Sequence, residues 1–318
     1  MAKLLYTVDD LVSEIRSLLD ENNTDSVSTS VDILPALNRA QDYAWDIYAR
    51  RYPSPILKQA TLDLTANTQD YTIPEDCYQD RVLHIDIAVA TGAAGTSYDP
   101  LERIDPTSGY REESTAAVAA PSKYYIHGRY IRVIPASSGT FDGRIFYVRE
   151  PDKLVLSQGR ITAINTGSNY ITVDAIGSSI STTADNIANY LNIIDGQTGE
   201  IKRTMQVSST SSSDLRVTFR SSLSRSTVLG RTVSTTIGSD AAVDDYICLV
   251  QGTCVPYFGS PTVNFLTQFA VAQIAPRKGT ASGLEEDRLL ERFEKQIGST
   301  WSGRETTMRI TPKSRVWR

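Results

Sequence analysis

The sequence has few of the side chains on which most enzyme chemistry depends. Its 318 residues include 2 histidines, 3 cysteines and 3 methionines. Each histidine has a structural interpretation, since His84 falls on the polar face of an alternating strand and His127 falls in a predicted turn. The sequence contains no glycine-rich phosphate loop, nucleophile elbow or paired-cysteine metal spacing. We therefore expect no enzymatic activity, no cofactor and no metal.

Long apolar runs and a strong charge imbalance are also missing. No run is long enough to cross a bilayer, and acidic residues interrupt the opening MAKLLYTVDD before a signal-peptide core could form. The formal net charge is -5, without a basic stripe interleaved with aromatic residues. The scattered Cys77, Cys248 and Cys254 fit buried thiols in a reducing compartment. These absences predict a protein made in the cytosol, with no membrane partner and no sequence-specific DNA recognition.

Two amphipathic helices are predicted near the start of the chain. The first follows Thr7 and Asp10, which are placed as a capping box. Its apolar stripe, at spacings of three and four, consists of Val8, Leu11, Val12, Ile15, Leu18 and Leu19. The second helix covers residues 31–52, with Pro35 tolerated in its first turn. Each helix has one apolar face and must pack on another element.

The middle of the chain has the two-residue hydrophobic period of strands. Alternation begins near Lys58, and KYYIHGRYIRVIP contains two β-rich runs around a predicted hairpin turn at His127-Gly128. Residues 157–240 differ in kind, because short β-patterned pieces alternate there with turn clusters rich in Ser and Thr. We interpret them as an inserted small β-barrel or sandwich.

The segment after the insert predicts two closing helices. Ser260 is placed as an N-cap, with Pro261 at the first helical position. The last helix is expected over about residues 283–297, with Gly298 as its stop. Its apolar face consists of Leu289, Leu290, Phe293 and Ile297.

The final stretch, residues 301–318, is basic and lacks helical periodicity. A frayed terminus is one interpretation. The stretch also contains apolar anchors that are costly to leave in water, which favours an arm that orders against a partner. These anchors are Trp301, Met308, Ile310, Val316 and Trp317.

Paired carboxylates offer the one catalytic alternative, because two acids at the correct separation can cut a glycosidic bond. The candidates are Asp76 with Asp80, Asp244 with Asp245, and the run at 285–287. Loop polarity, turn capping and helix-dipole complementarity explain each of them without catalysis. A cell-wall hydrolase is therefore a third hypothesis, ranked after the two that are described below.

The order of these elements resembles the head-to-tail adaptor (connector, or head-completion) proteins of tailed phages. TVDDLVSEIRSLLDE followed by DILPALNRAQDYAWDIYARRYP is similar to that family's N-terminal helical pair. LTANTQDYTIPEDCYQDRVLHIDI, YYIHGRYIRVIPAS and REPDKL resemble its β-segments, while DDYICLVQG and LEEDRLLERFEKQIGS resemble its closing part. The inserted segment looks like a small β-module of several phage structural proteins, and the shortest adaptors lack it.

The resemblance implies a non-enzymatic joint of the virion neck, assembled in the host cytoplasm. Such a protein forms a ring of about twelve copies on the portal protein and connects it to a tail nozzle or tail-tube protein. DNA passes through the ring without specific binding, which a net-acidic body permits because it lacks basic contacts to phosphate.

The implied fold is α+β: a helical bundle body from the N- and C-terminal helices, with a β-sheet region, an inserted β-domain and an extended tail. The body covers residues 1–156 and 241–300, the inserted domain 157–240, and the C-terminal arm 301–318. The family's C-terminal extensions order along the outside of the portal. On that basis the expected portal-binding residues are Arg309, Ile310, Lys313, Arg315, Val316, Trp317 and Arg318.

The main alternative is a tail component that binds a host receptor or glycan, since Ser/Thr-rich β-modules also occur there. The helical ends argue against it, because fibres and spikes are usually trimeric coiled coils or β-helices, and the sequence shows neither heptads nor solenoid repeats. Rings bound to portal would favour the adaptor, and trimers that bind polysaccharide would favour the alternative.

Overall fold

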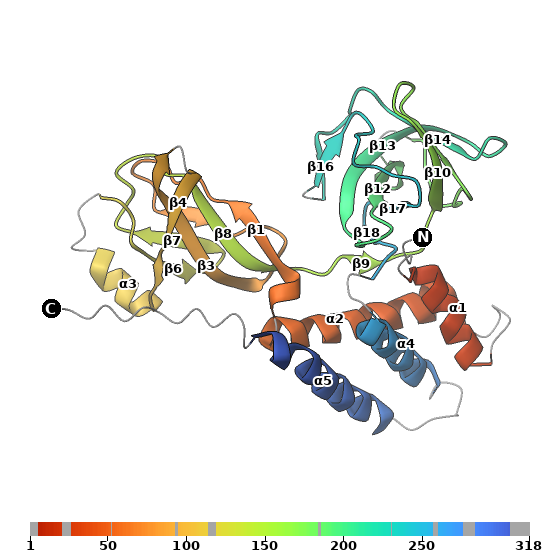
Figure 1. Ribbon diagram of the computed structural model, residues 1–318, viewed down its shortest axis with the longest axis horizontal. Coiled ribbons are helices and arrows are strands. Elements are labelled where there is room, and N and C mark those ends of the chain that lie inside the picture. Colours follow the sequence, from red (N-terminus) through yellow and green to blue (C-terminus); the bar gives the residue numbers. More distant parts are fainter. Residues whose placement is uncertain are drawn as a thin grey trace. The chain divides into compact units, whose positions relative to one another are not determined.

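The chain forms two compact units in a computed structural model (Figure 1). One unit combines Met1–Ile47 with Asp152–Arg318, and the other is Tyr48–Pro151. Helices and strands occur in both, which confirms the α+β class. The structure describes residues 6–20, 27–51, 53–92, 95–113, 119–183, 186–229, 231–256, 260–275 and 284–305.

The first helix, α1 (Val8–Leu18), begins with the predicted capping box. Thr7 Oγ1 accepts a hydrogen bond from the backbone N–H of Asp10, and the Asp10 carboxylate accepts one from the Thr7 N–H at 2.8 Å. The second predicted helix is divided, because a π-helical turn, η1 (Thr29–Ile33), precedes α2 (Leu34–Arg51). Pro35 lies in the first turn of α2, where its missing N–H costs no helical hydrogen bond.

A row of aromatic rings joins the closing helices to α2. Phe293 of α5 (Leu284–Glu305) stacks on Phe265 of α4 (Ser260–Ile274), with ring centroids 4.1 Å apart. Phe265 contacts Phe269, which in turn contacts Tyr43 of α2. The predicted stop at Gly298 is wrong, because α5 continues to Glu305. No helix in the described ranges is long and apolar enough to span a membrane.

Six antiparallel strands of the larger unit close into a barrel. The hydrogen-bonded order returns to its start because β10 pairs with both β11 and β17. Its interior contains residues such as Ile171, Leu191, Met205 and Ile247, all 0% exposed. Going round the barrel, the strands are β10 (Gly159–Asn165), β11 (Tyr170–Val173), β14 (Arg216–Phe219), β13 (Ile201–Ser211), β12 (Tyr190–Ile194) and β17 (Tyr246–Leu249).

Short elements flank the barrel. On the β13 side, β16 (Arg231–Ser234) pairs in parallel with β13 and antiparallel with β15 (Thr227–Val228). A 3-10 turn, η3 (Ile187–Asn189), precedes β12. The chain segments on either side of the barrel, β9 (Lys153–Leu154) and β18 (Gly252–Thr253), pair in parallel. The barrel therefore begins and ends next to one short two-stranded connection.

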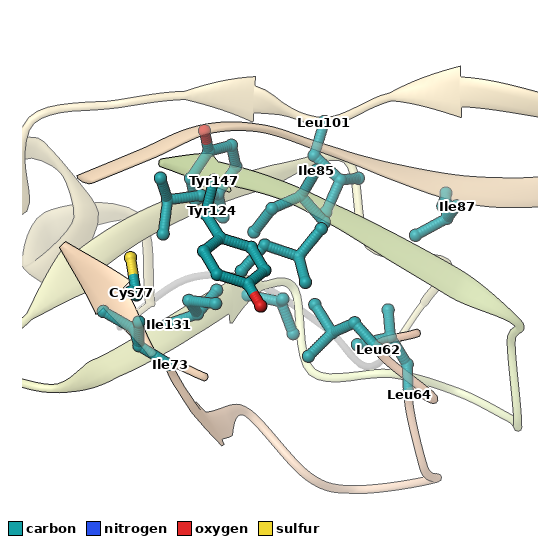
Figure 2. Close-up of a cluster of buried hydrophobic side chains, with 13 residues drawn as sticks. Leu62, Leu64, Ile73, Cys77, Ile85, Ile87, Leu101, Tyr124, Ile131 and Tyr147 are labelled. Carbon is teal, nitrogen blue, oxygen red and sulfur yellow. The ribbon is translucent and has the colours of Figure 1, made fainter. Parts of the chain in front are cut away.

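The smaller unit has two four-stranded sheets that share one core (Figure 2). Ile85 and Tyr147 from the first sheet and Tyr124 and Ile131 from the second are buried together. In hydrogen-bonded order the first sheet is β1 (Leu57–Thr61), β8 (Gly143–Arg149), β3 (Cys77–Gly92) and β4 (Gly95–Pro100); the second is β2 (Asp70–Thr72), β7 (Tyr130–Ile134), β6 (Lys123–His127) and β5 (Glu102–Arg103).

Two short helices complete the smaller unit. The 3-10 turn η2 (Ser54–Ile56) leads into β1. Helix α3 (Pro106–Glu113) packs on β6, where Gly109 lies so close to the ring of Tyr125 that a Cβ atom has no room. Tyr125 is 0% exposed as a result of this cover, although it lies outside the shared core.

The helical bundle body is not supported, because the N- and C-terminal helices share their unit with the barrel. The two compact units divide the chain at Ile47/Tyr48 and Pro151/Asp152, and the predicted map of an adaptor body, 1–156 and 241–300, with a C-terminal arm stays a prediction. The barrel itself needs β17, so it extends beyond the predicted end of the insert at 240. Because residues 157–240 lack this strand, we predict that the independently folding unit includes β17.

Candidate functional site

The predicted portal-binding residues cannot be placed. Arg309, Ile310, Lys313, Arg315, Val316, Trp317 and Arg318 all lie outside the described residues. The backbone of 301–305, assigned to the arm from the sequence, is the last part of α5. The arm therefore follows a helix that is packed on α4 through Phe293.

Both histidines have structural roles. His84 is exposed on β3 and stacks on Phe146 of β8, with centroids 4.2 Å apart. The predicted turn at His127 is displaced by one residue, because His127 ends β6 and Gly128 begins the turn with a φ of 57°. The Nδ1 atom of His127 lies 2.9 Å from the hydroxyl of Tyr110.

The candidate carboxylates form local ion pairs. Asp76 accepts hydrogen bonds from Lys58 Nζ at 2.6 Å and from the Tyr147 hydroxyl at 2.7 Å. Burial alone would raise the pKa of Asp76, but these two hydrogen bonds outweigh burial and lower it. Asp80 lies 3.7 Å from Arg129. Each acid of this pair therefore has a structural explanation.

Asp244 and Asp245, the second candidate pair, have separate partners. Asp244 lies 2.7 Å from Arg160, whereas the buried Asp245 lies 2.9 Å from Lys202. Lys202 also lies 2.9 Å from Asp195. Burial would raise the pKa of Asp195, but hydrogen bonds from Lys202 and from nearby backbone N–H groups outweigh it and lower the pKa to about 2. This cluster fixes the β12–β13 turn to the segment before β17.

The cysteines are buried free thiols, as the sequence suggested. Burial raises the pKa of Cys77 to about 12, which keeps this thiol protonated and unreactive. Within the described part of the chain, no group of three or more His, Cys, Asp and Glu side chains could hold a metal ion.

A set of hydrogen bonds joins the N-terminal helices to the chain at the base of the barrel. The Val8 N–H donates to the Cys254 carbonyl at 2.8 Å, and the Ser157 N–H donates to the Asp9 carboxylate at 2.9 Å. Gln41 Nε2 donates to the carbonyl oxygen of residue 152 at 2.7 Å. These bonds lie on the chain segments directly before and after the barrel. They therefore hold this end of the barrel against α1 and α2.

The end of α1 and the facing surfaces of α4 and α5 enclose a surface groove of about 330 Å³. Its apolar lining comes from Leu18, Val271 and Leu289, and its polar lining includes Gln268, Arg288 and Arg292. Leu18 is 57% exposed, although the sequence placed it on the packing stripe of α1. Sequence periodicity placed Leu18 and Leu289 on the apolar faces of their helices. It did not predict that the two side chains line one groove.

Comparison with known proteins links this architecture to one family. The family model described as SU10 adaptor protein matches residues 6–176, more than half of the 318 residues. The matched stretch contains α1, α2, the whole smaller unit and the strands from β9 to β11. A search of the curated proteins finds no match.

Proposed function

Because the chain belongs to the SU10 adaptor protein family, we propose that it docks on the portal ring of a bacteriophage particle and joins it to the tail nozzle or tail tube. The single observation that carries this proposal is the family match over residues 6–176. It spans elements of both compact units. The role is structural and non-enzymatic, in the virion neck.

A ring of about twelve copies around the DNA channel is the assembly that we propose. A ring interface is heterologous, so each copy needs two different lateral faces in addition to its axial contacts. Two compact units supply such distinct surfaces. The formal net charge of -5 suits a channel wall past which a duplex can slide, because acidic groups make no attractive contact with phosphate.

The basic arm after α5 is the segment that we propose orders along the outside of the portal. Its cationic side chains, Arg309, Lys313, Arg315 and Arg318, carry charge opposite to that of the whole chain. They would steer the arm to an acidic groove of the partner, while Ile310, Val316 and Trp317 would supply buried contact. We expect Trp317 to contribute most, with truncation costing about 2 kcal/mol of binding energy.

Deleting 306–318 tests this role without shortening α5. We expect the full chain to bind its purified cognate portal and the deletion variant to lose most of that binding. Trp317→Ala should weaken binding more than Arg318→Ala, because a buried aromatic contact outweighs one exposed charge. Binding unchanged by the deletion would make the arm a frayed terminus. Loss of DNA binding alone would assign it to nucleic acid.

A further inference from the structure

The groove between α1, α4 and α5 has the features of a docking site. Its volume of about 330 Å³ lies at the low end of the range for ligand pockets. Leu18, Val271 and Leu289 give it an apolar lining from three different helices. Leu18 is 57% exposed, so covering it would remove apolar surface from water.

Two arginines give the groove a positive rim. Arg288 and Arg292 are one turn apart on α5 and therefore lie on the same helix face. Both arginine side chains are exposed. Gln268 adds an uncharged polar group from α4. An occupant with negative charge would complement this rim.

The charge of the rim disfavours the chain's own C-terminal arm as the occupant. Insertion of the arm would place Arg309, Lys313, Arg315 and Arg318 near Arg288 and Arg292. Like charges brought together in this way oppose binding. The apolar side chains of the arm fit the lining, but its cations do not fit the rim.

We propose that this groove binds an acidic amphipathic helix of a partner protein. A large apolar side chain of that helix would enter between Leu18, Val271 and Leu289, and its carboxylates would pair with Arg288 and Arg292. The groove lining includes none of the residues proposed for portal binding, so the two proposals can fail independently.

Fluorescence anisotropy of the full chain with designed peptides tests the proposal. The probe is a labelled amphipathic helical peptide with Leu and Phe on one face and Glu on the other. One control peptide has Lys at every Glu position, and a second has Ser at every Leu and Phe position. We expect binding of the acidic probe, weakened by added salt, and much weaker binding of both controls.

Matched variants locate the binding. Arg288→Glu with Arg292→Glu should weaken the acidic probe at least about tenfold, and Leu18→Ser should weaken it about fivefold. Arg225→Glu with Arg39→Glu repeats the charge change at two exposed arginines outside the groove lining, and Leu229→Ser changes a leucine with 59% exposure. These control variants should bind as the wild type does.

Gln268→Arg adds a third cation to the rim and should tighten binding of the acidic probe about threefold. Misfolding cannot produce such a gain. The proposal is wrong if the acidic probe does not bind the wild-type chain, if the Lys peptide binds equally well, or if the rim and control variants behave alike.

Discussion

Asn38 and Leu154, 116 positions apart in the chain, exchange two hydrogen bonds. The Leu154 N–H donates to Asn38 Oδ1 at 2.8 Å, and Asn38 Nδ2 donates to the Leu154 carbonyl at 3.1 Å. The side chain of Asn38 thereby replaces a backbone partner for β9 and ties this strand to α2. Within the larger unit, this pair fixes the start of the barrel connection to a helix.

Replacing Asn38 by Ala should destabilise the larger unit by about 1 to 3 kcal/mol, because the nearly buried Leu154 loses its N–H and C=O partner. Urea unfolding followed by circular dichroism measures this change. Arg39→Ala, at the exposed neighbouring position, is the matched control and should change stability little. Equal effects at the two positions would contradict the assigned role of Asn38.

Lys202→Met should destabilise the protein by about 3 kcal/mol, because it leaves the buried carboxylate of Asp245 without its cation. Lys202→Arg keeps the positive charge and should cost less. Thermal unfolding of the two variants at neutral pH gives the comparison. A Met variant as stable as the wild type would show that the ion pairs of Lys202 add nothing to the fold.

The same cluster predicts loss of stability in acid. The pKa of Asp195 is about 2 in the folded protein and about 3.9 when unfolded. Since the folded pKa is lower, the contribution of Asp195 is complete above the unfolded value and is lost as the pH falls toward 2. Unfolding free energies measured across this interval should therefore decline less in Asp195→Asn than in the wild type. Parallel pH profiles would refute the assignment.

Removal of the barrel should depend on where the chain is cut. Replacing 159–249 with a short Gly-Ser linker removes the barrel with β17, and its cut ends are close because Gly159 pairs with Ile247. We expect a soluble, helical remainder, although it exposes Cys254 and Val255. Replacing 157–240 leaves β17 without its barrel partners and should cause aggregation. Soluble expression and helical circular dichroism distinguish the two deletions.

Local rules in the sequence predicted the parts of the fold that depend on neighbouring residues. The capping box of Thr7 and Asp10, the position of Pro35 in the first turn of α2 and the exposed face of His84 all follow from short-range pattern. Each was predicted because the responsible partner is near in the chain or repeats at a fixed period.

Long-range contacts explain what the sequence did not reveal. Gly298 signals a helix stop, yet α5 continues to Glu305; intrinsic propensity is a weak prior that context overrides. The barrel needs β17 for closure, which no change of composition marks. The groove forms because Leu18 meets α4 and α5 from the other end of the chain.

The isolated chain should be mainly monomeric, because a partner surface lowers the entropic cost of aligning many copies. Sedimentation of the purified protein at micromolar concentration should show one species of the chain mass, 35.0 kDa. A stable ring formed without portal would contradict this order of assembly.

Cryo-microscopy of the full chain mixed with its cognate portal tests the adaptor role most directly. We predict a closed ring of about twelve copies seated on the portal, with density for the segment after α5 along the portal's outer surface. Failure to bind portal, with the chain found instead as trimers that bind polysaccharide, would contradict the adaptor role and favour a receptor-binding tail component.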